Sequence, residues 1–392
     1  MFSARASYLR PDFCEYPTPG LSGFRAEMPP KLPSTTRALT LRKSTGPKPV
    51  YHPVDLEEKP IPVLKKGEVL VKVNAAGFNH RDVWIRKGMY PGIVFGSTLG
   101  GDAAGVVVAS SDSSDPLLNK RVFLVPTRGW EKNPDGPESP TGIGIMGGGK
   151  LPAIGAFSEY VAVERDQVIP SPEHLDDVHV AAWPIGGVTS WRAVHVNARV
   201  EKGHNVFITG IGGGVALLAL QICLAKGANV YVSSSSEAKI AQAVALGAKG
   251  GVNYKNAEWP KQLAAIPKKT DRPYLDSVID SGGGDLARLL GGVLKPGGRI
   301  VCYGMTASPQ INFTMREVLR NHQLIGSTMG SHQDLIDATR FIAEHKIVPV
   351  VSHVCDGLGS AEEGFELMKQ GAQFGKIIIK IHDESGPVKS KL

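Results

Sequence analysis

The sequence has few cysteines, and none of them stands in a metal-binding or redox pattern. The four are far apart: Cys14, Cys223, Cys302 and Cys355. Without a C-x-x-C pair, neither a redox motif nor a disulfide framework is expected. Cys223 and Cys302 lie in apolar segments, where buried and unreactive thiols are common. A chain of this kind fits a reducing compartment.

Long apolar runs and clusters of like charge are also missing. No uninterrupted apolar segment approaches the ~18 residues that span a bilayer, so we expect no membrane-crossing helix. The formal net charge of +7 is spread along the chain, without a basic run interleaved with aromatic residues. Nucleic-acid binding is therefore not expected. The apolar content of 42% and charged content of 21% are ordinary for a globular enzyme.

The length of 392 residues exceeds the usual limit of one core, so two domains are expected. Residues 1–35 are rich in Pro, Ser and Arg and lack periodicity, which predicts a disordered or variable extension. Arg5 and Arg10 leave a mitochondrial presequence open, whereas Asp12 and Glu15 argue against it. There is no apolar segment of a secretory signal, so the predicted location is the cytoplasm.

Residues 36–175 are expected to form a β-rich domain. Strand-like segments lie at 37–41, 68–73, 104–109, 121–125 and 156–161. Gly and Pro breaks between them favour an antiparallel, barrel-like arrangement. Segment 127–152 is rich in Gly and Pro and predicts a long loop. Strand-like segments 348–354 and 376–381 indicate that residues 346–385 complete this domain, leaving 386–392 as a tail.

Strands alternate with helices in residues 176–345, which predicts a parallel, doubly wound sheet. Expected strands lie at 206–209, 228–232, 277–280, 299–303 and 323–326, and expected helices at 215–225 and 334–345. The Gly-rich turn after the first of these strands is the most informative stretch. Its four glycines fall within five positions: Gly210, Gly212, Gly213 and Gly214. Such glycines let the backbone approach a pyrophosphate, and the following helix offers free N–H groups.

The spacing of this turn matches G-x-G-x-x-G/A imperfectly. Val215 stands at the sixth position, so Ala216 or Gly214 must supply the close contact between helix and strand. A tight loop without a ligand is the alternative interpretation. The position of the turn between a buried strand and an uninterrupted helix favours dinucleotide binding.

The end of the second strand indicates which dinucleotide binds. NAD sites usually place Asp or Glu there to accept from the ribose 2′-OH. Here the strand runs into Ser233, Ser234, Ser235 and Ser236, with Lys239 following. A carboxylate would repel a 2′-phosphate, whereas hydroxyls and an ammonium group would hold it, so NADPH is predicted. The alternative is that these serines are solvated turn residues and Lys239 is a surface charge.

Several further segments agree with one known superfamily in the same order along the chain. They are AAGFNHRDVWIRKGMY, LGGDAAGVV, GAFSEY, AAWPIGGVTSWRA, LGAKGGVNY, LKPGGRIVCYG and FGKIIIKI, together with the Gly-rich turn. Residues 36–382 resemble the medium-chain dehydrogenase/reductase superfamily, specifically its zinc-independent quinone oxidoreductase-like branch. The resemblance implies a GroES-like catalytic domain, a Rossmann domain, a cleft between them and, since dimers are common in the family, a homodimer.

The residues at the zinc-ligand positions of this family point away from a metal. Zinc-dependent relatives carry a Cys in the segment matching residues 77–82 and a His-Glu pair near Gly100. This chain has Asn79 and Gly101-Asp102 there, and no cysteine between residues 15 and 222. A catalytic zinc needs three protein ligands, which His80 and Asp82 alone do not supply. We therefore expect a protein without zinc.

Without a metal, polar donors must stabilise the charge that develops on a carbonyl oxygen. The resemblance places Asn79, His80 and Tyr90 in the segment that lines the substrate cleft. Asn79 would bond the carbonyl through its amide, Tyr90 would donate a proton, and His80 would donate or relay one. Alternatively, Asn79 caps the next helix, His80 packs at the surface and Tyr90 sits at the rim. Asp82 fits a helix-start charge better than a catalytic base.

The resemblance also implies further cofactor contacts at four positions. Thr189 would lie beside the nicotinamide and phosphates, and Tyr254 on the adenine or phosphate side. Gly304 would let the nicotinamide ring approach the backbone, and Lys376 would be a cofactor-side lysine. The alternatives are a buried hydroxyl that bonds within its own helix for Thr189, an edge residue for Tyr254 and a strand-surface lysine for Lys376.

Together these features predict an NADPH-dependent, zinc-independent reductase. Hydride would pass to a quinone or an α,β-unsaturated carbonyl compound, with a proton from the cleft or from water. Two other functions stay open from the sequence. One is a reductase acting in trans on acyl or polyketide enoyl thioesters, and the other is a non-catalytic redox sensor that binds NADPH.

Overall fold

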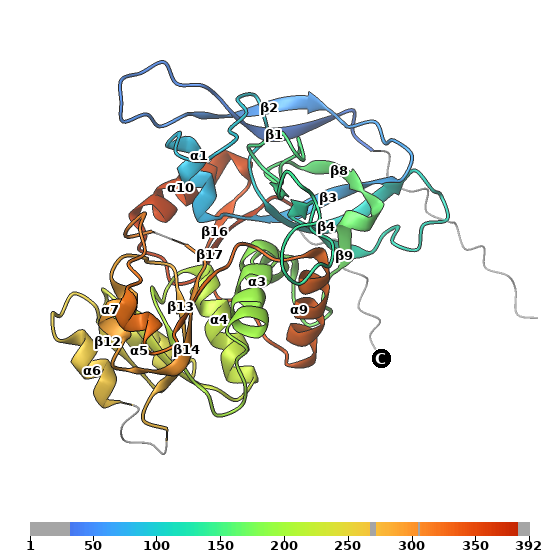
Figure 1. Cartoon of the computed structure of the whole chain (residues 1–392). Helices are drawn as coiled ribbons and strands as arrows, with labels where there is room; N and C mark the ends of the chain where they lie inside the picture. Colours follow the sequence, from blue (N-terminus) through green and yellow to red (C-terminus); the bar gives the residue numbers. More distant parts are fainter. Residues whose placement is uncertain (1–31, 267–271, 305, 383–392) are drawn as a thin grey trace, which may run out of the picture. The chain divides into compact units, whose positions relative to one another are not determined.

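The computed structural model describes residues 32–266, 272–304 and 306–382. The chain divides into two units, Met1–Pro33 and the much larger Ser34–Leu392. The predicted extension 1–35, the tail 386–392 and Cys14 therefore fall wholly or mostly outside the described residues, and the structure describes Thr35 as the first residue of a strand. Two sheets form the framework of the larger unit (Figure 1).

The first sheet has seven strands in the order β16-β17-β3-β4-β5-β9, with β8 also paired to β3. Its strands are β3 (Glu68–Gly77), β4 (Asp102–Ser110), β5 (Arg121–Leu124), β8 (Tyr160–Glu164), β9 (Val168–Pro170), β16 (Val351–Asp356) and β17 (Lys376–Lys380). Neighbouring strands are antiparallel except for the parallel pair β16–β17. The late strands β16 and β17 thus join the early strands, as Figure 1 shows. A ribbon of β1 (Thr35–Leu41) and β2 (Val54–Pro60) forms a sheet of its own.

The second sheet has six strands, all parallel, in the order β12-β11-β10-β13-β14-β15. They are β10 (Asn205–Ile208), β11 (Asn229–Ser234), β12 (Gly250–Asn253), β13 (Leu275–Asp280), β14 (Leu294–Cys302) and β15 (Gln323–Gly326). Side chains alternate between its faces because successive strand residues point in opposite directions. Val206 and Ile208 enter one apolar core and Phe207 enters another on the opposite face.

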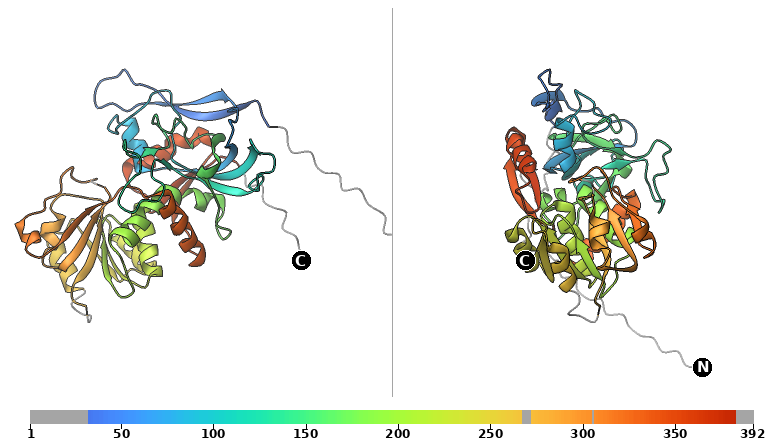
Figure 2. Two further views of the ribbon diagram at one scale, coloured as in Figure 1. Left: turned by 45° about the vertical axis from the view of Figure 1, so that its right-hand side comes forward. Right: turned by 60° about the vertical axis from the view of Figure 1, so that its left-hand side comes forward.

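Helices cover both faces of this parallel sheet (Figure 2). The core around Val206 contains residues of α3 (Pro184–Trp191), α4 (Gly214–Ala225), α5 (Glu237–Ala245) and α9 (His332–Glu344). The core around Phe207 contains residues of α6 (Trp259–Ala265) and α7 (Leu286–Leu290), and α7 contacts α8 (Met315–Val318). The predicted fold class, a GroES-like domain with a Rossmann doubly wound sheet, is confirmed.

The two sheets share one apolar core, which holds them in a fixed position relative to each other. That core combines Ala75 and Ala104 of the first sheet with Val206 and Ile208 of the second. Helix α2 (Asp177–Ala181) packs on the first sheet, and α3 follows it after Trp183, whose indole N–H donates to the Thr339 hydroxyl of α9 at 2.9 Å. A π-helical segment, Arg192–Asn197, ends this connection.

Several elements differ from the sequence-based expectations. Segment 156–161 becomes a strand only from Tyr160, because Ala156 and Phe157 instead bond to the backbone of Gly100 and Leu99. The expected loop 127–152 contains one two-residue pair, β6 (Thr127–Arg128) with β7 (Gly144–Ile145). Helices α1 (His80–Arg86) and α10 (Ala361–Gln370), which contact each other, and strand β2 were not predicted as elements.

Candidate active site

A cleft opens at the carboxyl ends of the parallel strands, where the strand order reverses between β10 and β13. Such switch points are where open α/β sheets bind ligands. The cleft encloses about 160 Å³. It is lined by Phe78, Asn79, His80, Gly186, Gly210, Gly213, Gly214, Val215, Ser281, Tyr303, Thr306, Met368, Gln373, Gly375 and Lys376. Residues from both sheets therefore face one space.

The Gly-rich turn forms one wall of the cleft and needs glycine at specific positions. Gly210 and Gly212 have φ angles of 64° and 124°, in the region that other residues rarely adopt. The turn is held by Ile211 N–H, which donates to Ser233 O at 2.8 Å, and by Gly375 N–H, which donates to Gly212 O at 2.9 Å. No side chain among the described residues caps α4, so its first N–H groups remain available to an anion.

Beside the turn lies a largely buried cluster formed by Asn79, Asp102 and Lys376. The Lys376 ammonium donates to Asn79 Oδ1 at 2.8 Å and lies 2.9 Å from Asp102 Oδ2. Asn79 Nδ2 donates to the same Asp102 oxygen at 2.8 Å, and Ile185 N–H donates to Asp102 Oδ1 at 2.8 Å. Asp102 is 0% exposed and Lys376 4%. Both carboxylate oxygens and the ammonium group of this buried pair thus have partners within the protein.

The contacts of this cluster define the roles of two predicted residues, Lys376 and Asn79. Lys376 lines the cleft, and a Cβ placed on Gly214 would lie 2.6 Å from its Cδ atom, so glycine lets the lysine pass close to the start of α4. The Asn79 amide, predicted to bond a substrate carbonyl, is engaged with Asp102 and, at 3.4 Å, with Gly77 O. Asp102 was not predicted as a site residue.

Helix α1 places His80 at the cleft and fixes its own start with Asp82. His80 is exposed, and its ring lies 5.9 Å from that of Trp84. Desolvation by neighbouring atoms, and the charge of Lys87, hold the pKa of His80 below its ordinary value. Buried Asp82 accepts from Asn79 N–H at 2.8 Å, as a helix-start charge should, and burial raises its pKa to about 6. This environment favours the neutral form of the His80 imidazole.

Three other predicted residues are not among the described residues that line the cleft, although Gly304 borders it, since a Cβ there would lie 3.5 Å from Ser281 O. Tyr90 packs against the Arg81 guanidinium, whose central carbon lies 4.9 Å from the centroid of the tyrosine ring. Thr189 is buried in α3 with its hydroxyl 3.7 Å from the Met329 sulfur. Gly304 follows Tyr303 at the end of β14. Asn79, His80, Lys376 and the Gly-rich turn are thus brought together, whereas these three are not among them. Ser281, Tyr303, Met368 and Gln373 line the cleft and were not predicted.

The predicted 2′-phosphate residues divide into buried and accessible ones. Ser233 and Ser234 are buried, and Ser234 Oγ accepts from Ser236 N–H at 3.2 Å. Lys239 instead lies against the Gly-rich turn, because a Cβ on Gly212 would be 2.9 Å from its Cδ. Its ammonium donates to Gly371 O at 2.8 Å, and desolvation lowers its pKa.

The space beside Lys239 is large and carries no facing carboxylate among the described residues. A cavity of about 590 Å³ is lined by Ser236, Ala238, Lys239, Gln242, Val350, Val351, Ser352, Ala372, Gln373 and Phe374. Glu237 instead accepts from Asn253 Nδ2 at 2.9 Å, beside β12. Tyr254, the next residue, is 49% exposed, and its N–H donates to Ser234 O at 3.1 Å.

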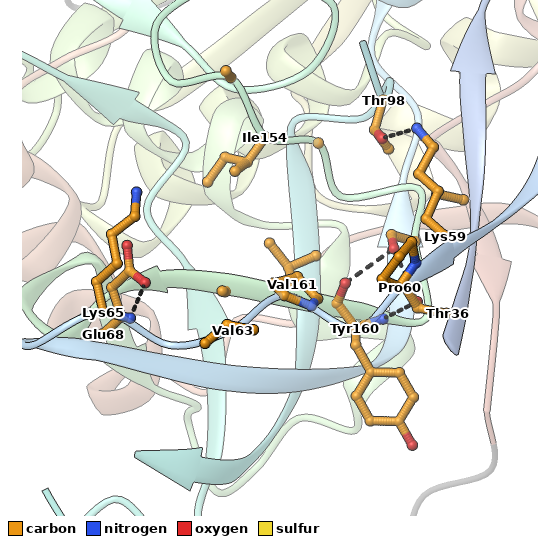
Figure 3. Close-up of a pocket in the computed structure, with 16 residues that line it drawn as sticks. Thr36, Lys59, Pro60, Val63, Lys65, Glu68, Thr98, Ile154, Tyr160 and Val161 are labelled. Atoms are coloured by element: carbon orange, nitrogen blue, oxygen red, sulfur yellow. Dashed lines mark hydrogen bonds between the residues drawn. The ribbon is translucent and has the colours of Figure 1, made fainter. Parts of the chain in front are cut away.

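A different pocket of about 380 Å³ lies against β2 and β8, away from the Gly-rich turn (Figure 3). Its polar groups bond to one another. Lys59 Nζ donates to Thr98 Oγ1 at 3.4 Å, and Tyr160 N–H donates to Thr36 Oγ1 at 3.1 Å. No residue of the Gly-rich turn or of α1 lines it within the described part of the chain, so it is not the candidate active site.

The cleft does not fit a catalytic zinc ion. Asn79 offers an amide in place of a thiolate, and that amide is bonded to Asp102 and Lys376. Gly101 has no side chain that could bind a metal, and Ile185 Cδ1 would lie 2.5 Å from a Cβ at this position. Asp102 is already neutralised by Lys376. These residues provide fewer than the three ligands that a catalytic zinc requires.

Comparison with known proteins agrees with this two-part architecture. Residues 65–173 match the alcohol dehydrogenase GroES-like domain, and residues 214–344 match the zinc-binding dehydrogenase family. A zinc-type alcohol dehydrogenase-like protein of Leptosphaeria maculans is 41% identical over 357 residues, covering 88% of this chain and 99% of that protein. One from Schizosaccharomyces pombe is 31% identical, covering 83% and 94%.

Solved structures extend the likeness. An NAD-dependent alcohol dehydrogenase has a TM-score of 0.77 and 30% identity, covering 88% of this chain and 99% of its own. A crotonyl-CoA carboxylase/reductase in complex with NADP has a TM-score of 0.74, and the match covers 90% of this chain and 96% of that one. At 20% identity, this likeness shows a shared fold. The chain belongs to the medium-chain dehydrogenase/reductase superfamily and is an oxidoreductase of its alcohol dehydrogenase-like group. None of the helices in the described segments is long and apolar enough to span a membrane.

Replacing Asp102 by asparagine tests the buried cluster. The substitution keeps the shape of the side chain but leaves the Lys376 charge buried without its counter-charge. Removing one partner of a buried ion pair typically costs about 3–5 kcal/mol, so we expect a loss of that order in the free energy of unfolding, measured with urea. The double variant D102N/K376M should recover part of it. Asp135→Asn, at an exposed position, serves as control. Equal stability of D102N and the native protein would contradict the role of the pair.

Proposed function

We propose that the protein is an NADPH-dependent oxidoreductase that reduces a quinone or an α,β-unsaturated carbonyl compound without a metal. The observation that carries the proposal is the Asn79–Asp102–Lys376 cluster, in which Lys376 pairs with two residues, Asn79 and Asp102, that the resemblance places where zinc-dependent relatives carry a Cys and a His-Glu pair. The branch of the superfamily that this implies is the zinc-independent, quinone oxidoreductase-like one.

The choice of NADPH is supported by the charges around the Gly-rich turn. The free N–H groups at the start of α4 suit a pyrophosphate. Lys239 brings an ammonium group to the side of the turn where the ribose of the adenosine would lie. The nearest acid, Glu237, is bonded to Asn253. This arrangement offers a cation for a 2′-phosphate and withholds the carboxylate that a ribose 2′-OH would use.

The bound cofactor would supply the hydride, and the protein would manage charge and protons. As hydride reaches the β-carbon of an enone, negative charge develops on the carbonyl oxygen. Lys376 and Asn79 line the cleft, and because their ammonium and amide groups are bonded within the cluster, they would act on that charge electrostatically and not through a direct hydrogen bond. His80 lines the same cleft, and its imidazole would relay a proton from water to the product: one ring nitrogen gives up its proton while the other takes one from water.

Lys239→Glu tests the cofactor assignment. We expect the KM for NADPH to rise roughly tenfold or more, since hydrogen bonds to charged groups contribute about 1.5–3 kcal/mol, while the KM for NADH changes little. Steady-state kinetics with both nucleotides would measure this. Lys249→Glu makes the same charge change at an exposed residue before β12 and should alter neither constant. Equal increases for both nucleotides in the Lys239 variant would remove the assignment to NADPH.

Stopped-flow oxidation of NADPH with a panel of quinones and enones tests the reaction. We expect turnover that survives treatment with a chelator, and a fall in kcat of roughly 10²-fold or more for His80→Gln if it is the proton donor. NADPH binding without oxidation would instead indicate a redox sensor. Oxidation only with enoyl thioesters would indicate an acyl reductase. Loss of turnover on chelation, with the protein still folded, would contradict metal-free chemistry.

We also propose that the protein is a homodimer that pairs through β15. This strand is at the edge of the parallel sheet, and most of its residues are exposed. Beside it, Met315, Val318 and Leu319 are 67%, 53% and 81% exposed. Unpaired edge strands beside apolar side chains favour pairing with a second copy.

Light scattering tests the dimer. We expect the native protein to have twice the mass of one chain and Leu319→Glu to shift it towards the monomer. Leu246→Glu places the same charge on α5, which lies away from β15, and should leave the mass unchanged. A native protein of single-chain mass would overturn this proposal.

A further inference from the structure

Outside the cleft, three side chains with metal-binding atoms meet between β16 and α10. They are His353, Cys355 and Glu363, and a ring nitrogen, the thiol sulfur and a carboxylate oxygen all lie within 4.8 Å of one another. It is the one such group of three or more among the described residues. Three donors of the nitrogen, sulfur and oxygen types make a composition that zinc sites in proteins use.

The local fold brings these residues together from two elements. His353 and Cys355 are two positions apart on β16, so their side chains point to the same face of the strand. That face meets α10, which packs on β16 and carries Glu363 in its first turn. A short 3₁₀ turn, Leu358–Ser360, reverses the chain between the two elements. The spacing is thus set by a strand, a tight turn and a helix start.

The donor atoms are close but are not hydrogen-bonded to one another. His353 Nε2 lies 3.0 Å from Glu363 Oε1, yet this nitrogen, shielded from solvent, has no hydrogen-bond partner among the described residues. A buried polar atom left unpaired costs about 1–3 kcal/mol. A cation accepting the lone pairs of both atoms would remove this cost. The same 3.0 Å separation that allows an ion pair also fits two ligands of one ion.

Cys355 supplies the third donor from inside the protein. It is a free cysteine, and its residue is 1% exposed. Burial, with the charge of Glu363, raises the pKa of its thiol to about 11. A metal must therefore displace the thiol proton on binding, which makes affinity increase with pH. One divalent cation, one thiolate and one carboxylate then sum to zero charge, which suits a partly buried site.

We propose that His353, Cys355 and Glu363 bind one Zn²⁺ ion, with water as the fourth ligand. On binding, the metal–sulfur bond replaces the S–H bond and one proton leaves to solvent. The site would tie the start of α10 to the sheet edge. Helix α10 backs the cleft, since a Cβ on Gly364 would collide with the ring of Phe78, the residue before Asn79. The ion would thus stabilise the fold without touching the reacting atoms, and this proposal does not rest on the proposed function.

Binding of Co²⁺ and Zn²⁺ to the full chain tests the site. After removal of metals with a chelator, we expect one Co²⁺ per chain, with a near-ultraviolet absorption band from the sulfur–metal bond that Zn²⁺ abolishes. Zn²⁺ should also raise the Tm, because a ligand that binds only the folded state stabilises it. Cys355→Ser should remove the absorption band, and His353→Gln and Glu363→Gln should weaken binding at least tenfold.

Matched variants decide where the metal binds. Asp356→Asn, at an exposed position on the same strand, and His80→Gln, in the cleft, should bind Co²⁺ as the native protein does. If Cys355→Ser fails to fold, the His353 and Glu363 variants still test the site, since both side chains are partly exposed. Absence of binding at micromolar Zn²⁺ would overturn the proposal. So would binding that survives both His353→Gln and Glu363→Gln.

Discussion

The structure depends on one buried charge pair, Lys376 with Asp102, completed by the amide of Asn79. Each member begins or caps a different element: Lys376 starts β17, Asp102 starts β4, and Asn79 precedes α1. Asp102 also receives the N–H of Ile185 from α3. Since desolvation makes a buried pair unfavourable unless its remaining hydrogen bonds are made, arrangements of these four elements that break the cluster are disfavoured. The shape of the cleft follows from this cluster, because Asn79 and Lys376 line it.

The parallel sheet and its nucleotide turn follow closely from local sequence. β15 has the bounds expected for it, 323–326, and α4 begins within one residue of the expectation. The buried strand β10 is short and apolar, with the Gly-rich turn soon after it, and α4 is a long apolar helix; buried parallel strands carry apolar residues on both faces. The family assignment also followed from local motifs, because each motif encodes a turn or a close backbone approach. Zinc independence and NADPH remain predictions, since the relatives are named zinc-type proteins or an NAD-dependent enzyme.

The parts of the site that were not predicted depend on long-range partners. Lys376 and Asp102 are 274 positions apart, and no local pattern pairs them. From the sequence, Asp102 was therefore interpreted only as part of the pair that replaces the His-Glu of zinc-dependent relatives. The four serines 233–236 are equivalent in sequence, yet Ser233 and Ser234 are buried at the end of β11, and only the later part of the segment borders the large cavity. Helix α10 was not predicted, because Gly364 in its interior lowers helix propensity. Glycine is needed at this position because the Phe78 ring lies against it.

The hydrogen bond from the Lys239 ammonium to the carbonyl of Gly371 has a thermodynamic consequence. A nucleotide phosphate that bound the Lys239 ammonium would replace the Gly371 carbonyl as its acceptor, and would not simply displace water from a hydrated cation. The gain on binding is then the difference between a carbonyl and a dianion as partners, rather than the whole of a new contact. The carbonyl released from Lys239 belongs to the loop that leads to Gln373. Because Gln373 lines both the large cavity and the cleft, binding of a phosphate at Lys239 would change the surroundings of a residue in the cleft.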